Sequence, residues 1–321
     1  MIYIDGIPYI ESDNDYIRSA VIDRIHDWNV TVTTSGTTGH PKVVHHSKEL
    51  VKQISEFNTD WFGLDSSSVM FQQYSPRGIA FTTMSLYPAL LADCDLYIET
   101  EVGPKYIDRI NQIKPTHTLV LPNVYKVLSK HRKWKDIDYS SCKQVLMGSD
   151  YTPKGALHDL RNKGAQSVFN VYGSTEVPPN VFMSELEDRY GSIVSPLVDY
   201  DIKDNELWVK YHLQDSWWQS GDLVESSYNG FKLVGRKLNM FKLGDCGTRV
   251  YPEQVEKSVV EAGADLALCR NVNNKCVIYY TGKLNKTIDL QQDIKYTIVN
   301  VESLRVDDNL RKIDRTQNII V

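Results

Sequence analysis

The sequence predicts an α/β protein: a large N-terminal α/β domain with a β-rich section, followed by a small C-terminal α+β domain. Three observations predict this class. Short runs rich in β-branched residues alternate with helix-like segments, as they do in α/β proteins. The pattern becomes β-rich after about Pro196, and a short basic stretch near Gly235 precedes a smaller α+β tail. Because a chain of 321 residues is long enough for two domains, we expect domains at residues 1–235 and 236–321.

Local patterns predict the elements of the first domain. A helix is expected to begin near Ser47, whose hydroxyl suits an N-cap. Another is expected after Gln144–Met147, with Thr152 as its cap and Gly164 at its end. The predicted strands are Val30–Thr33, Leu96–Glu99, Thr118–Leu121, Gln144–Met147 and Ser167–Val171.

The later elements are predicted in the same way. Residues Asn205–Tyr211 alternate apolar side chains on one face, as a half-buried strand does. Phe231–Val234 is expected to be its hairpin neighbour, after a turn at residues 228–230. Pro252 opens a tail helix that buries Val255 and Val259, and Gly263 closes it.

Composition excludes several classes of protein. The net charge is −5, whereas a protein that binds nucleic acid or an anionic membrane usually shows a basic face. No run approaches the length of a membrane span, and the acidic N-terminus lacks the features of a signal peptide. The five cysteines are scattered and form no C-x-x-C pair, which favours reduced thiols. We therefore expect a soluble, cytoplasmic protein with no nucleic-acid or membrane partner.

The adjacent histidines His45 and His46 raise the question of a metal site. Neighbouring residues of a strand point to opposite faces. We therefore interpret the pair as incidental rather than metal-binding.

The segment with the most chemical information is Thr33–Lys42, TTSGTTGHPK. Its glycines permit close approach of a ligand, and its hydroxyls and Lys42 suit the polyphosphate of a nucleotide. It is not a Walker loop, because His40 and Pro41 stand between the second glycine and the lysine. On this segment alone, a flexible Ser/Thr/Gly turn remains the alternative.

This segment resembles the phosphate-binding loop of the ANL superfamily of adenylate-forming enzymes, which includes acyl-CoA synthetases and the adenylation domains of nonribosomal peptide synthetases. Further segments resemble motifs of that family in the same order along the chain, which makes the match specific. They are Asn170–Glu176 (Y-G-x-T-E), Asn205–Val209 (G-E-L), Ser220–Leu223 (T-G-D), Gly235–Lys242 (the hinge), Gly247–Glu256 (its continuation) and Arg311–Arg315 (G-K-I-D-R).

The resemblance implies an enzyme that uses ATP and Mg²⁺ to convert a carboxylic acid into an acyl-adenylate, releasing pyrophosphate. It implies that Thr175 contacts the α-phosphate and Glu176 holds Mg²⁺, and that Lys312 bridges the attacking carboxylate and the α-phosphate. The implied nucleotide contacts are Thr34, Ser35, Gly36, Thr37, Thr38, Gly39 and Lys42 at the phosphates, Tyr172 at the adenine, and Asp222 and Arg236 at the ribose. Asn170 and Gly173 are further nucleotide-binding candidates, and Gly148 is expected at another edge of the nucleotide pocket.

Each of these roles has a structural alternative. Tyr172 could belong to the core, Glu176 could be a solvated loop acid and Asp222 a turn residue. Lys312 could belong to a basic tail. The sequence also departs from the family pattern, with Leu238 at the usual hinge acid and Arg311 before the candidate lysine. The phosphate loop begins close to the first residue, so the resemblance is to a shortened member.

The acid and its acceptor are less defined. In the family the acyl pocket lies near the segment that here contains Tyr74, Arg77 and Gly78, and an arginine there would pair with a second carboxylate or another polar group. After adenylation, we expect transfer to CoA or a carrier thiol. Transfer to an amine, and a non-catalytic nucleotide-binding remnant, are the alternatives. A missing subdomain would leave apolar surface, which suggests a homodimer.

Overall fold

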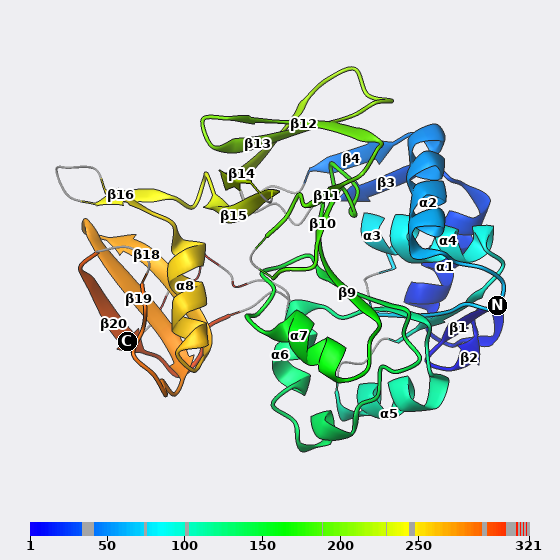
Figure 1. Cartoon of the computed structure of the whole chain (residues 1–321), viewed down its shortest axis with the longest axis horizontal. Coiled ribbons are helices and arrows are strands. Elements are labelled where there is room, and N and C mark those ends of the chain that lie inside the picture. The colour runs from blue at the N-terminus through cyan, green and yellow to red at the C-terminus, as the bar shows by residue number, and fades with distance from the viewer. Residues whose placement is uncertain are drawn as a thin grey trace. The chain divides into compact units, whose positions relative to one another are not determined.

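The computed structural model describes residues 1–33, 42–73, 76–99, 103–187, 189–228, 230–243, 248–290 and 294–305, with Ile313, Arg315, Gln317 and Ile319. The chain divides into two compact units (Figure 1). Unit 1 contains Met1–Asp199 and Lys210–Trp218, and unit 2 contains Tyr200–Val209 and Gln219–Val321. The predicted α/β class is confirmed. The domain boundary expected at residue 235 stays a prediction.

A nine-stranded sheet forms the centre of unit 1, in the order β11-β10-β9-β8-β7-β5-β6-β1-β2. The six strands from β9 to β1 are parallel to their neighbours, and β2, β10 and β11 are antiparallel. The strands are β1 (Ile2–Ile4), β2 (Ile7–Pro8), β5 (Val69–Gln72), β6 (Asp95–Ile98), β7 (His117–Leu119), β8 (Gln144–Gly148), β9 (Ser167–Tyr172), β10 (Phe182–Ser184) and β11 (Ile193–Val194).

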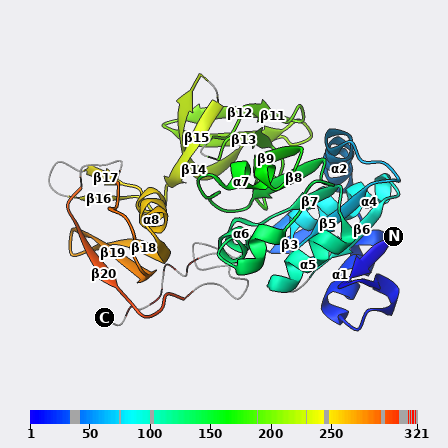
Figure 2. The same ribbon diagram turned by 60° about the horizontal axis from the view of Figure 1, so that its bottom comes forward.

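Helices connect these strands. They are α1 (Asp15–His26), α2 (Lys48–Phe62), α3 (Ile79–Phe81), α4 (Tyr87–Leu91), α5 (Pro104–Ile113), α6 (Pro122–Leu128) and α7 (Ala156–Asn162), with short 3₁₀ helices η1 (Tyr9–Glu11) and η3 (Arg132–Asp136) and a π-helix η2 (Thr82–Leu86). From β5 the chain winds to β6 on one side and to β7, β8 and β9 on the other (Figure 2). In such sheets ligands bind beyond the carboxyl ends of the strands, near the point where the winding reverses.

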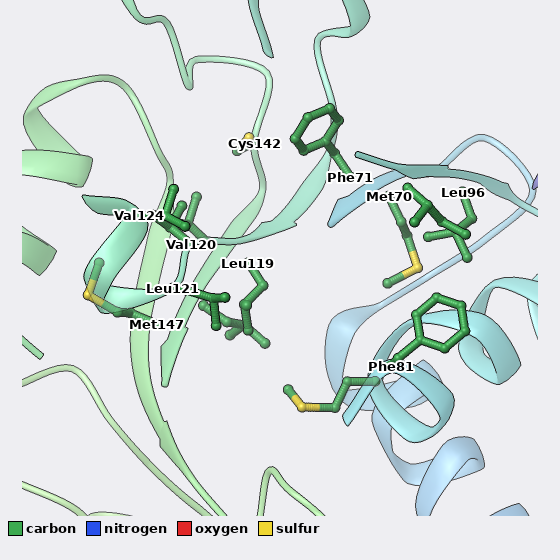
Figure 3. Packing of buried hydrophobic residues seen from close by; sticks show 14 of the residues in the cluster. Met70, Phe71, Phe81, Leu96, Leu119, Val120, Leu121, Val124, Cys142 and Met147 are labelled. Atoms are coloured by element: carbon green, nitrogen blue, oxygen red, sulfur yellow. The ribbon is translucent and has the colours of Figure 1, made fainter. Parts of the chain in front are cut away.

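Alternation along β5 brings its two faces into contact with different helices. Phe71 packs edge-on against Tyr106 of α5, with ring centroids 5.3 Å apart. Met70 points the other way and, with Leu96 of the neighbouring strand, faces Phe81 (Figure 3). All five of these core side chains are at least 95% buried. Burial on both faces explains why these parallel strands read as continuous apolar runs rather than as alternating ones.

A separate two-stranded sheet, β3 (Val30–Thr33) and β4 (Val43–His46), joins the two ends of residues 34–41. Thr33 pairs with Val43 and Val30 with His46. Ser47 follows at once and caps α2, because its hydroxyl accepts a hydrogen bond from the Leu50 N–H at 3.3 Å. The predicted strand at Val30–Thr33 and the predicted cap at Ser47 are both confirmed.

Unit 2 is built from small sheets and one helix. Its residues form most of a sheet in the order β12-β13-β14-β15, a pair β16-β17 and a sheet in the order β18-β19-β20. The elements are β12 (Val198–Lys203), β13 (Glu206–Tyr211), β14 (Trp218–Ser227), β15 (Gly230–Arg236), β16 (Phe241–Leu243), β17 (Thr248–Val250), α8 (Pro252–Glu261), β18 (Ala264–Val272), β19 (Lys275–Gly282) and β20 (Tyr296–Asn300). As predicted, α8 begins at Pro252 and buries Val255 and Val259.

Two predicted details were wrong. The strand paired with Phe231–Val234 is β14, which separates it from β13. Helix α7 begins at Ala156, after Gly155, and Thr152 does not cap it. The Thr152 hydroxyl instead donates a buried hydrogen bond of 2.8 Å to the Asn170 side chain, so a contact with β9 replaces the expected local cap.

Among the described residues, no helix combines the length and the apolar character needed to cross a membrane.

Candidate active site

At the carboxyl ends of β8 and β9 the backbone is packed so closely that two positions accept only glycine. A Cβ on Gly148 would lie 2.5 Å from the Val171 carbonyl oxygen, and one on Gly173 would lie 2.2 Å from the Cα of Pro179. Both distances are below any ordinary van der Waals contact. The resemblance singled out both glycines, and their packing supplies a physical reason for them at the edge of a candidate ligand site.

Beyond Gly173, a compact turn presents Thr175 and Glu176. The Ser174 N–H donates to the Val177 carbonyl at 2.7 Å, and the Val177 N–H donates to the Ser174 hydroxyl at 3.1 Å. Thr175 and Glu176, between these bonds, are half-buried. Ser174 therefore closes the turn, and the two candidate catalytic side chains lie at its tip.

Side chains from three distant elements, β4, β13 and α2, form hydrogen bonds with this loop. His46 of β4 contacts the Thr175 carbonyl through Nε2 at 2.7 Å. The buried Tyr211 hydroxyl donates to the Pro178 carbonyl at 2.9 Å. Asn180 donates to Asn58 of α2 at 2.7 Å, and Asn58 donates in turn to the carbonyl of Thr83 in the π-helix at 2.8 Å. We call residues 173–181 the anchored loop.

His46 is neutral in this arrangement. It is 97% buried, since 3% of its surface is exposed, and burial lowers its pKa against the opposing effects of the Thr175 hydrogen bond and the Glu176 carboxylate. Because Nε2 faces a carbonyl oxygen, Nε2 carries the proton and Nδ1 is an acceptor. Within the described part of the chain, Nδ1 has no hydrogen-bond partner. His45 points to the opposite, exposed face and contacts the Thr31 hydroxyl at 2.8 Å.

Tyr172 and Asn170 precede the anchored loop on β9. Tyr172 is 8% exposed, and its ring packs edge-on against Tyr190 with centroids 5.6 Å apart. Asn170 is fully buried, accepts from Thr152 and donates to the Glu187 carbonyl at 3.0 Å. These contacts give both side chains structural roles, and their contact with adenine stays a prediction.

Several candidate residues lie outside the described residues: Thr34, Ser35, Gly36, Thr37, Thr38 and Gly39 of the phosphate loop, Tyr74 of the acyl segment, and Lys312. Lys42, just after the loop, is exposed, and Gly78 immediately precedes α3. The guanidinium of the exposed Arg77 lies 4.9 Å from the centre of the Tyr16 ring. This contact gives Arg77 a surface role, and recognition of the acid by Arg77 stays a prediction.

In unit 2, the two candidate ribose ligands are brought together. Asp222 of β14 and Arg236 of β15 are direct partners in the strand register, and Nε of Arg236 lies 2.6 Å from Oδ1 of Asp222. Asp222 is 2% exposed and Arg236 is 39% exposed. The pair therefore holds one buried carboxylate beside one accessible guanidinium.

Glu206 organises the residues next to this pair. It is 3% exposed and accepts hydrogen bonds from Gln219 at 2.8 Å, the Gly221 N–H at 3.1 Å and Lys237 at 2.7 Å. Burial opposes its ionisation, but these donors outweigh burial and lower its pKa. The residue before it, Asn205, has φ +63°, which explains why asparagine stands where the family motif has glycine.

The segment that carries Lys312 is attached to α8 through Arg315. Arg315 pairs with both carboxylate oxygens of Glu256 at 2.7 and 2.6 Å, and Glu256 also accepts from the Cys269 N–H at 2.9 Å. Arg270 donates to the Arg315 carbonyl and, at 2.8 Å, to that of Gln317. Partly buried charged groups therefore fix the backbone at Arg315.

No role follows from the sequence for His46, Asn58, Asn180 or Glu206. Glu206 does lie in the segment Asn205–Val209 that resembles the G-E-L motif. The contact of His46 spans 129 residues of sequence, so no local pattern reveals it.

Comparison with known proteins places these observations in context. The family described as AMP-binding enzyme matches residues 11–207. The chain is similar to indoleacetate–CoA ligase of Aromatoleum aromaticum, with 24% identity over 277 residues that cover 71% of this chain and 51% of the relative. It is also similar to feruloyl-CoA synthase of an Amycolatopsis species, with 22% identity over 70% of this chain and 52% of the relative. The chain thus spans about half the length of these curated relatives.

Solved structures share the fold. The o-succinylbenzoate CoA synthetase of Bacillus subtilis in complex with AMP has a TM-score of 0.73 and 18% identity, covering 89% of this chain and 68% of that one. An amide bond synthetase from Marinactinospora thermotolerans has a TM-score of 0.70 and 17% identity, covering 87% of this chain and 67% of that one.

The close approach at Gly173 predicts a large loss of stability in Gly173→Ala. The new methyl group would overlap backbone rather than a flexible side chain, and overpacking of this kind costs at least about 2 kcal/mol. Urea denaturation measures the change in unfolding free energy. Gly103→Ala is the control, because Gly103 has extended backbone, φ −178°, and open space around its Cα. Equal stability of the two variants would contradict the packing described.

The lowered pKa of Glu206 predicts how Glu206→Gln responds to pH. The ionised group contributes stability above its ordinary pKa of 4.5, and this is lost as pH falls through the lower folded value. We expect the variant to be about 1 kcal/mol less stable than wild type at pH 7, since Lys237 is half exposed. The difference should shrink below about pH 4.5, as measured by denaturation across pH. Asp201→Asn, which breaks an exposed pair of 3.5 Å with Lys203, should have almost no effect. A difference independent of pH would count against the ion pair.

Proposed function

This chain belongs to the AMP-binding enzyme family, and on that basis we propose that it activates a carboxylic acid as an acyl-adenylate and then transfers the acyl group to the thiol of CoA or of a carrier protein. The observation that carries the proposal is the anchored loop. It presents Thr175 and Glu176 from a backbone fixed by His46, Tyr211 and Asn58, and fixed donors and charges are what phosphoryl and nucleotidyl transfer chiefly require.

The proposed first step is an in-line substitution at the α-phosphorus of ATP. A carboxylate oxygen of the acid forms a bond to that phosphorus, and the bond from the phosphorus to the bridging oxygen breaks, so that pyrophosphate leaves. Thr175 donates to the α-phosphate, and Lys312 neutralises charge on the attacking carboxylate and the α-phosphate. The loop of Thr34–Gly39 with Lys42 receives the departing phosphates through backbone N–H groups, hydroxyls and one ammonium.

The nucleoside is assigned to two groups of residues. Tyr172 lies against the adenine, with Gly148, Asn170 and Gly173 forming the edge of its pocket. Asp222 accepts hydrogen bonds from the ribose hydroxyls, and the exposed Arg236 contacts the ribose. The position of these residues supports the assignment, because Gly148 and Gly173 lie at the carboxyl ends of β8 and β9, the edge at which such sheets bind ligands.

Glu176 is the proposed ligand of Mg²⁺. Magnesium prefers oxygen donors and is commonly held by one or two carboxylates together with substrate phosphates. The half-buried Glu176 and the neighbouring Thr175 hydroxyl provide such donors, and no cluster of three metal-binding side chains occurs among the described residues. The donor set therefore fits a metal that is completed by ATP, and the bound ion would neutralise charge on the phosphates.

The acid is assigned to the segment of Tyr74, Arg77 and Gly78. The curated relatives are named for indoleacetate and ferulate, which makes acids with an aromatic ring the first class to test. An amine acceptor, giving an amide, is the second candidate, and the similarity to an amide bond synthetase supports testing it.

Exchange of labelled pyrophosphate into ATP tests the first step. We expect exchange that requires both Mg²⁺ and a carboxylic acid, because reversal of acyl-adenylate formation returns label to ATP. A panel of aryl, alkyl and dicarboxylic acids identifies the substrate, and CoA or amines added afterwards identify the acceptor. ATP binding without exchange for any acid would favour a non-catalytic remnant.

The matched variant for this test is Lys312→Ala. It should lose exchange by at least about a hundredfold, since one positioned charge commonly contributes ~10²–10³ to a rate, and it should retain ATP binding by calorimetry. Lys286→Ala, which removes an exposed lysine of unit 2, is the control. Undiminished exchange in Lys312→Ala would refute its role.

A further inference from the structure

We infer that His46 is a positioning residue of the proposed adenylation site: by donating a hydrogen bond to the Thr175 carbonyl, it fixes the backbone that presents Thr175 and Glu176. The catalytic consequence of this inference rests on the proposed function. The hydrogen bond between His46 and Thr175 does not depend on it.

The backbone of His46 is held from both sides. Its register partner in β3 is Val30, and the next residue, Ser47, caps α2. Strand alternation turns His46 inward and His45 outward. His46 is therefore 3% exposed, whereas His45 lies on the exposed face. The end of strand β4, rather than a loop, therefore places the imidazole in the interior.

The contact joins two segments that the proposal assigns to the phosphates of ATP. Strand β4 begins one residue after Lys42, at the end of the phosphate loop, and Thr175 lies 129 residues further along the chain. The bond length of 2.7 Å is short for an N–H···O bond. A displacement of the Thr175 carbonyl would move the Thr175 hydroxyl and the Glu176 carboxylate together, because both residues belong to the same turn.

A carbonyl is a specific partner for the Nε2–H tautomer. The other buried side chains that hold the anchored loop are Tyr211, which donates to Pro178, and Asn58, which accepts from Asn180. Neither bond is to Thr175. Loss of His46 would therefore leave the turn attached at its far end while releasing the tip. The expected consequence is a change in nucleotide contacts rather than unfolding of the loop.

Two conservative variants separate the hydrogen bond from the bulk of the ring. The amide nitrogen of glutamine reaches about as far as Nε2, whereas that of asparagine reaches about as far as Nδ1. We expect His46→Asn and His46→Ala to weaken MgATP binding and to lower kcat for pyrophosphate exchange, each by about tenfold, the factor for one buried hydrogen bond. His46→Gln should restore both to within about threefold of wild type. His45→Ala, on the exposed face, is the matched control and should change neither.

Calorimetry with MgATP, exchange kinetics and thermal denaturation are measured on the same preparations. A purely structural role would lower Tm while leaving the dissociation constant of the folded protein unchanged, and this result would overturn the inference. So would equal rescue by glutamine and asparagine. The ¹⁵N resonances of the His46 ring give a readout independent of activity, with protonated Nε2 expected and protonated Nδ1 alone contradicting the contact.

These readouts keep the two proposals distinguishable. If wild type binds MgATP but exchanges pyrophosphate with no acid, the proposed function fails and the calorimetric comparison still decides the role of His46. If wild type does not bind MgATP, the positioning role fails as well, whatever the tautomer of the ring.

Discussion

The anchored loop between β9 and β10 is the constraint on which the rest of the site depends. A loop at the carboxyl end of a sheet is ordinarily free to move, since its backbone groups bond to water. Here buried side chains of β4, α2 and β13 supply partners for it. Each such bond contributes only about 1 kcal/mol net, but leaving one partner buried and unpaired costs about 1–3 kcal/mol. These bonds therefore favour one conformation of the loop, and glycine at 173 makes that conformation sterically accessible.

In unit 2, charged side chains hold the backbone in place, as uncharged side chains do in the anchored loop. Glu206 accepts hydrogen bonds from three donors, one of which is Lys237, and Glu256 pairs with Arg315. Neutral hydrogen bonds in unit 1 and carboxylate side chains in unit 2 thus hold the backbone. Lys237 is half exposed and Arg315 is 31% exposed, so each of these carboxylates fixes a partly solvated cation.

The sequence predicted those parts of the fold that depend on neighbours in the chain. Strand Val30–Thr33, the cap at Ser47 and the buried face of α8 follow from alternation, capping and helical spacing, and the structure has all three. Strand β14 was missed because Ser220-Gly221-Asp222 in its middle has the composition of a turn. The start of α7 was wrong because Thr152 bonds to Asn170, a residue of β9. The contact of His46 with Thr175 was missed for a similar reason: its partner is distant in sequence, and pattern alone carries no information about such contacts. The ordered motifs identified the family, but they did not reveal what holds the motifs in place.

The central claim is that the anchored loop is organised before any ligand binds. Amide hydrogen exchange of the ligand-free protein tests it most directly, because the Ser174, Val177 and Val181 N–H groups all donate within the loop, to Val177, Ser174 and Tyr172 respectively. The account predicts that these amides exchange far more slowly than an unstructured peptide in the absence of nucleotide, and that added MgATP changes them little. Exchange at the unstructured rate, with protection only after MgATP is added, would contradict it.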